Sequence, residues 1–82
     1  MSTLTAADAR AAVAASVRAI VPDADLDTLD DDESLREAFE LDSLDFLSFV
    51  EGLNARTGVR IDESDYPRLT TMADCVAFLT SA

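Results

Sequence analysis

The chain has 82 residues, which is enough for one hydrophobic core but too few for a second lobe that could close over a substrate cleft. Seventeen acidic residues against six basic ones give a formal net charge of -11, and such a field repels nucleic acid and anionic lipid while it attracts basic protein surfaces. We therefore expect one domain over residues 1–82 that is not an enzyme, has no nucleic-acid or membrane partner, and meets proteins with basic surfaces.

Cysteine and histidine content restricts the chemistry further. The single cysteine, Cys75, has no second cysteine for a disulfide, and the chain contains no histidine that could share a metal with it. A lone thiol fits a reducing compartment, so we expect a cytoplasmic protein without a metal site. Because Cys75 lies near Val76 and Leu79 in a predicted helix, it is expected to be a small buried hydrophobic residue.

The N-terminal part of the chain predicts a helix. Thr5 and Asp8 form a capping pair of the Ser/Thr-x-x-Asp/Glu kind, and apolar residues then recur at helical spacing as far as Pro22. This pattern predicts a helix over about residues 5–21. Its many alanines favour helix and add little bulk, which predicts a close approach to a neighbouring helix.

Residues 22–41 form the longest segment without a sustained hydrophobic period, and they are rich in aspartate. Leu26 and Leu29 are the apolar residues that could anchor this loop. Ser34 and Glu37 make a second capping pair in front of Leu35, which predicts one buried helical turn inside the loop. Long loops of this kind usually have a function or cover part of the core, so we expect the loop to be pinned.

Three aspartates at alternate positions in this loop, Asp23, Asp25 and Asp27, suggest a calcium-binding EF-hand. That motif requires glycine at its sixth position and a bidentate glutamate at its twelfth. Thr28 and Ser34 occupy those positions here. The spacing therefore argues against a specific calcium site.

A second main helix is predicted over residues 43–57, with a core face made by four apolar residues and an end at Gly58, where glycine tolerates the positive φ that closes a last turn. The core residues are Phe46, Phe49, Val50 and Leu53.

Two further helices complete the predicted fold. Residues 62–66 are expected to form a short third helix that Pro67 ends, and Thr71 with Asp74 caps a last helix over residues 71–81. The fold class is therefore all-α: a small four-helix bundle with a long acidic loop between helices one and two and a short third helix.

Ser43 lies where the acidic loop becomes the second main helix, between Asp42 and Leu44. Unpaired backbone N–H groups and the positive end of the macrodipole favour a phosphate ester at such a position. The dipole is worth only about 0.3–1 kcal/mol, and a chain without histidine cannot build a Ser-His-Asp triad around the hydroxyl. Taken alone, these residues leave Ser43 either as a site of modification or as an ordinary helix cap, which is the commoner fate.

The run from Phe39 through Leu44 and Asp45 to Phe49 and Leu53 resembles the acyl carrier protein family, and with the acidic loop, the glycine stop and the capped last helix the resemblance covers nearly the whole chain. In that family a phosphopantetheinyl transferase attaches 4'-phosphopantetheine from coenzyme A to the serine of an Asp-Ser-Leu motif. The thiol of the arm then holds acyl groups as thioesters.

The resemblance implies that Ser43 bears the arm and that the chain is a non-catalytic carrier of the free-standing type. Tethering of this kind keeps a reactive intermediate at high effective concentration near each partner. The alanine-rich first helix could mediate self-association, but an acidic monomer is the simpler expectation. The implied partners are the transferase and acyl-loading, ketosynthase or acyltransferase-type enzymes with basic docking surfaces. One departure is that the family commonly has glycine two residues before the aspartate, where this chain has Glu40.

The resemblance also implies a docking surface on the second main helix, on a side different from the core face. The docking candidates are Asp42, Leu44, Asp45, Leu47 and Glu51. The alternative is that Leu44 and Leu47 belong to the core and the acids form a solvated face.

Two other functions remain open at this point. One is a small acidic adaptor that binds a basic protein without any prosthetic group. The other is an aminoacyl or peptidyl carrier, which more often has glycine and histidine before the serine, so Leu41 and Asp42 favour the acyl type. The pathway, whether fatty-acid, polyketide or specialised, depends on the partner enzymes. The bulky Phe46 and Phe49 favour a specialised route.

Overall fold

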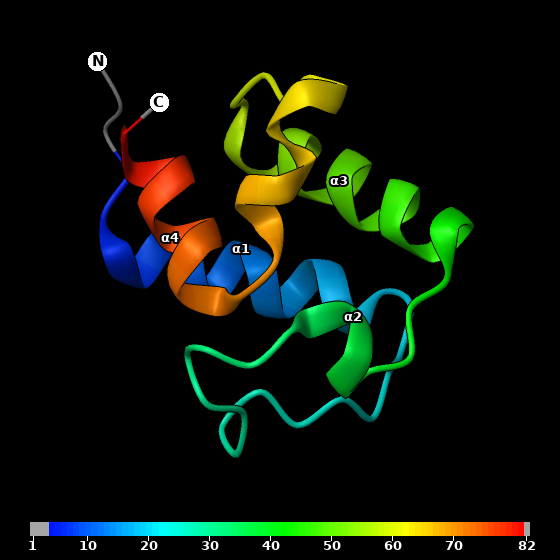
Figure 1. Cartoon of the computed structure of the whole chain (residues 1–82). Coiled ribbons are helices and arrows are strands. Elements are labelled where there is room, and N and C mark those ends of the chain that lie inside the picture. Colours follow the sequence, from blue (N-terminus) through cyan, green and yellow to red (C-terminus); the bar gives the residue numbers. More distant parts are fainter. Residues whose placement is uncertain (1–3, 82) are drawn as a thin grey trace.

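The computed structural model describes residues 4–81 and contains five helical elements arranged around one core (Figure 1). They are α1 (Ala6–Arg18), α2 (Leu35–Ala38), α3 (Ser43–Thr57), the 3-10 helix η1 (Glu63–Leu69) and α4 (Met72–Ser81). Residues 4–81 contain no strand, only an isolated bridge between Ser34 and Thr71. The predicted all-α small bundle is confirmed. None of the helices in these residues is long and apolar enough to cross a lipid bilayer.

Helix α1 begins with the predicted capping box. The Thr5 hydroxyl accepts from the Asp8 N–H at 3.0 Å, and the Asp8 carboxylate accepts from the Thr5 N–H at 3.2 Å. The helix ends at Arg18, three residues before the predicted end at position 21. A physical reason is Pro22, since the residue before a proline is disfavoured in helical conformation and the chain must turn earlier.

The core lies where α1 packs against both α3 and α4, with η1 covering α4. The four predicted core residues of α3, Phe46, Phe49, Val50 and Leu53, are all buried. The predicted close approach of α1 to a neighbour is found against α3. A Cβ atom added at Gly52 would lie only 3.1 Å from the Ser16 hydroxyl oxygen. Cys75 is also buried, as predicted, and burial raises the pKa of its thiol to about 12.

The long acidic loop is pinned, as its sequence predicts. Asp31 provides two of the attachments, because its carboxylate pairs with Arg10 of α1 and its carbonyl accepts from the Ala73 N–H at 3.1 Å. The hydrogen bond from Arg10 lowers the pKa of Asp31. One turn of α2 follows, with Leu35 buried and its N–H donating to the Thr70 carbonyl at 2.9 Å. Figure 1 shows the loop, in cyan to teal, returning from the end of α1 to α2.

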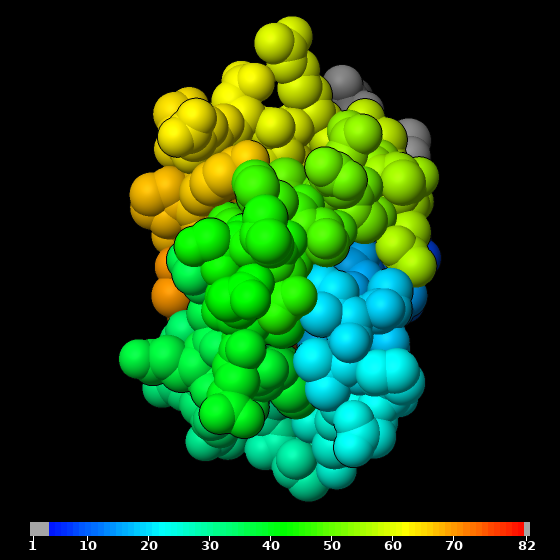
Figure 2. Space-filling view, turned by 90° about the vertical axis from the view of Figure 1, so that its right-hand side faces the viewer, coloured from blue at the N-terminus to red at the C-terminus, as the bar shows by residue number. Residues whose placement is uncertain are grey.

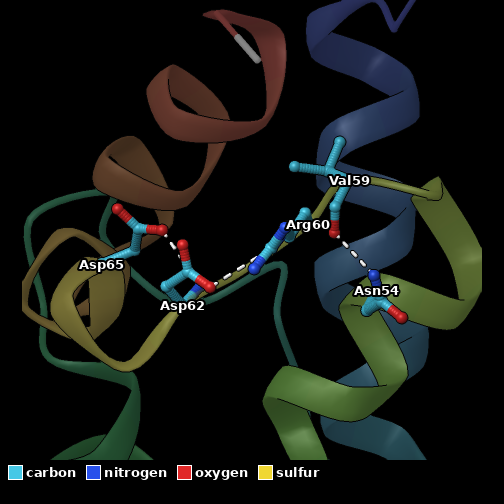
Figure 3. A network of polar contacts seen from close by, with 5 residues as sticks. All are labelled: Asn54, Val59, Arg60, Asp62 and Asp65. Carbon is cyan, nitrogen blue, oxygen red and sulfur yellow. Dashed lines mark hydrogen bonds and ion pairs between the residues drawn. The ribbon is translucent and has the colours of Figure 1, made fainter.

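The connection from α3 to η1 is ordered by short-range hydrogen bonds (Figure 3). Gly58 ends α3 with φ of 72°, as predicted for a glycine stop. Asn54 then donates from its side chain to the Val59 carbonyl at 2.8 Å, and the Asp62 N–H donates to the Asp65 carboxylate at 3.0 Å. Arg60 pairs with Asp62 at 3.3 Å.

The third helix differs from its prediction over residues 62–66. It is a 3-10 helix that runs through Pro67 and ends at the fully buried Leu69. Proline is compatible with this element because its fixed φ is helical, and the carbonyl left without a donor belongs to the exposed Ser64. The last helix is capped as predicted, with the Asp74 N–H donating to the Thr71 hydroxyl at 3.0 Å.

Candidate functional site

The start of α3 is capped by Asp42. Its side chain accepts from the Asp45 N–H at 2.8 Å, and the Asp45 carboxylate accepts from the Asp42 N–H at 3.3 Å. The Asp42 carbonyl takes the first intrahelical bond, from the Phe46 N–H at 2.9 Å. The capping role that the sequence left open for Ser43 is therefore wrong, because Asp42 and Asp45 satisfy the cap between them.

Ser43 is the first residue of α3 and is exposed. Its hydroxyl makes no hydrogen bond to any residue between 4 and 81, and the backbone N–H groups of Ser43 and Leu44 have no acceptor in the same range. A phosphate ester on this oxygen would lie at the positive end of the helix, next to two free donors. The hydroxyl can thus be modified without loss of the cap that holds the helix.

The turn that delivers the chain to Asp42 requires a left-handed residue. Glu40 has φ of 53°, and the Leu41 N–H donates back to the Arg36 carbonyl at 2.9 Å. This is the hydrogen bond of a Schellman motif, which closes the short helix α2 and normally places glycine at the left-handed position. The geometry explains why glycine is common here in the resembled family.

Leu44 and Leu47 are 74% and 42% exposed, so the alternative that they belong to the core is wrong. Glu51 is also exposed, one turn further along α3. Figure 2 shows the surface at the start of α3, in green, at the centre of one face of the molecule. Of the two acids in the capping box, Asp42 is exposed and Asp45 is half-buried.

A pocket of about 280 Å³ lies beside the first turns of α3. Its lining residues are Arg36, Phe46, Tyr66, Pro67, Leu69 and Thr70. The Tyr66 ring meets the Phe46 ring edge-on, with centroids 5.4 Å apart, and the Arg36 guanidinium carbon lies 5.2 Å from the centroid of the Phe46 ring. No local sequence pattern links Arg36 to Tyr66, because they belong to separate elements that only the fold brings together.

Comparison with known proteins identifies the family of this chain. The family model for the phosphopantetheine attachment site matches residues 11–79, a range that runs from α1 to α4 and includes Ser43. The chain therefore belongs to the family of phosphopantetheine-binding carrier domains. Domains of this family are non-catalytic carriers that bear 4'-phosphopantetheine covalently on a serine. A search of curated proteins and a search of solved structures each gave no match.

Proposed function

We propose that Ser43 carries the 4'-phosphopantetheine arm and that the protein holds acyl intermediates on it as thioesters. The observation that carries this proposal is the division of roles at the start of α3, where Asp42 caps the helix and the adjacent hydroxyl is exposed and unbonded. The match to the attachment-site family supports a pantetheinylated serine in this chain. Partner enzymes would do the chemistry, because no histidine is available to activate Ser43.

Intact-mass spectrometry tests the attachment directly. The purified chain is incubated with coenzyme A and a broad-specificity phosphopantetheinyl transferase, and we expect the mass of one arm to be added. Ser43→Ala should abolish the addition while the helix stays capped, since Asp42 provides the cap. Ser48→Ala is the matched control, because Ser48 is an exposed serine of the same helix. An unmodified wild-type mass, or modification of Ser43→Ala, would refute the assignment.

We further propose that Asp42, Leu44, Asp45, Leu47 and Glu51 form the docking surface for the transferase and for acyl-loading, ketosynthase or acyltransferase-type enzymes. The exposure of Leu44 and Leu47 supports this assignment, because a partner could bury two large apolar side chains that the fold leaves in water. The acids would meet basic residues of the partner and speed the encounter between the two proteins.

Glu51→Arg tests the electrostatic part of docking. We expect the transferase to modify this variant about 2- to 5-fold more slowly at low salt, as for the loss of an exposed charge pair. Glu63→Arg is the matched control, because it makes the same charge change at an exposed position of η1. The difference should shrink as salt is added, since the Debye length falls to about 8 Å at physiological ionic strength. Equal rates for the two variants at low salt would remove Glu51 from the docking surface.

The proposed cargo is an acyl group, not an aminoacyl or peptidyl group, and part of it would be sheltered by the bundle. The pathway would be fatty-acid, polyketide or specialised biosynthesis in the cytoplasm, with the carrier acting as a monomer. The alternative of an adaptor without a prosthetic group makes the opposite prediction in the mass experiment, which therefore separates the two functions.

A further inference from the structure

The pocket of about 280 Å³ is placed where the arm on Ser43 could reach it. Phe46 lines the pocket and follows Ser43 by three residues, so the two side chains lie on neighbouring turns of the same side of α3. Pockets for drug-sized ligands usually measure about 300–1,000 Å³, so a pocket of this size suits a short ligand. Phe46, Pro67 and Leu69 provide apolar wall.

Two donor groups that line the same pocket, the terminal nitrogens of Arg36 and the Tyr66 hydroxyl, have no acceptor in residues 4–81. Arg36 uses its Nε to donate to the Leu41 carbonyl at 3.5 Å, and its terminal nitrogens make no hydrogen bond or ion pair with the described residues. The Tyr66 hydroxyl likewise has no partner among them. The third polar group, the Thr70 hydroxyl, already donates to the Pro67 carbonyl at 2.9 Å.

Arg36 is exposed and makes no ion pair within residues 4–81, as is also the case for Arg18, Arg56 and Arg68. Acidic residues outnumber basic ones seventeen to six, and Glu37 and Glu40 are close to Arg36 in sequence. The guanidinium lies instead over the Phe46 ring and faces the pocket. A planar guanidinium binds carboxylates more strongly than neutral acceptors, because the hydrogen bonds are charge-assisted and can be bidentate.

We propose that this pocket selects short acyl cargo that ends in a carboxylate, with Arg36 and Tyr66 binding the carboxylate and Phe46, Pro67 and Leu69 contacting the methylene chain. The inference rests on attachment of the arm to Ser43. A purely hydrocarbon chain of the same length would contact the same walls but would form no charge-assisted hydrogen bond with either donor. Arg36 is thus a specificity-determining residue, contributed by α2, for a thioester formed on α3.

The test compares two cargoes of equal chain length, loaded on Ser43 by the transferase from glutaryl- or pentanoyl-coenzyme A. Intact mass is measured before and after thermal unfolding, so that loading and survival of the thioester are known for each sample. We expect the glutaryl form to melt about 4 °C higher than the pentanoyl form, the shift that a single added contact produces in a domain of this size. The Arg36 Nε–H resonance should move with glutaryl and not with pentanoyl cargo.

Arg36→Gln should abolish the difference between the two cargoes, and Tyr66→Phe should reduce it. Because the glutaryl and pentanoyl forms of the same variant are compared, a general loss of stability does not affect the result. Arg68→Gln is the matched control, since Arg68 also stacks on a phenylalanine, Phe78, but does not line the pocket. The Arg68→Gln variant should keep the full difference in melting temperature between the glutaryl and pentanoyl forms.

The outcomes separate the two proposals. If no arm is added to Ser43, the proposed function and the cargo inference fail together. If loading succeeds but the two forms melt alike, only the cargo inference is overturned. It is also overturned if Arg36→Gln shifts the melting temperatures of the unacylated and both acylated forms equally, because the guanidinium would then not distinguish the two cargoes.

Discussion

The left-handed conformation of Glu40 predicts that glycine at this position makes the protein more stable. A residue with a Cβ atom pays about 1–2 kcal/mol for this conformation, whereas glycine adopts it freely. Glycine also gives the unfolded chain more freedom, which costs about 0.4–1 kcal/mol. With the middle of each range, Glu40→Gly should be about 0.8 kcal/mol more stable. The melting temperature should then rise by about 3–6 °C.

Thermal and urea unfolding followed by far-ultraviolet circular dichroism measure this effect. Glu40→Ala is the control, because alanine removes the same negative charge but keeps the Cβ atom and therefore the strain. Loss of charge repulsion in this acidic chain would raise the stability of both variants, whereas relief of backbone strain raises only that of Glu40→Gly. Equal melting temperatures for the two variants would refute the conformational argument and leave only the charge.

Three further predictions concern the core and α3. Gly58→Ala should lower the free energy of unfolding by about 1 kcal/mol, because alanine is strained at the φ of 72° that Gly58 adopts. The added Cβ meets no atom within 4 Å, so no clash adds to this cost. The urea midpoint should fall while the m value stays constant. Gly52→Ala should cost up to about 2 kcal/mol, because overpacking against Ser16 costs about 1–3 kcal/mol and the better helix propensity of alanine offsets about 1 kcal/mol of it. Ser16→Ala deletes a buried hydroxyl without a partner in residues 4–81 and should recover part of the cost in a double-mutant cycle. The free energy of unfolding should fall above about pH 9 by up to about 1.4 kcal/mol per pH unit. The pKa of the buried Cys75 thiol is raised to about 12, so between about pH 9 and pH 12 this thiol ionises only in the unfolded chain. A Cys75→Ala variant whose urea midpoint falls equally steeply over that range would contradict the last prediction.

The features that the sequence predicted well are those set by residues three or four apart. The pairs Thr5–Asp8 and Thr71–Asp74 cap their helices as expected, and Gly58 ends α3, because each signal depends only on the local chain. The burial of Phe49 followed from helical spacing in the same way. Local signals therefore determine the number and order of the main helices.

The features that the sequence did not predict depend on contacts between distant segments. The extension of η1 through Pro67 follows the burial of Leu69, which no local pattern indicates. The pocket needs Arg36 from α2 and Tyr66 from η1 to meet at Phe46. The left-handed conformation of Glu40 was indicated only by the glycine that the family commonly has at this position, since a glutamate does not by itself predict a positive φ.

The capping box also changes how docking can be tested, because Asp45 has two roles. Its carboxylate accepts from the Asp42 N–H, so charge reversal at Asp45 would weaken the start of α3 as well as any contact with a partner. A slower transfer by an Asp45→Arg variant would then have two explanations, and the fold could not be assumed intact. The Glu51 side chain makes no hydrogen bond or ion pair within residues 4–81 and is exposed, so its charge reversal reports on docking alone. Experiments on the acidic face of α3 should therefore start from Glu51 and keep both caps.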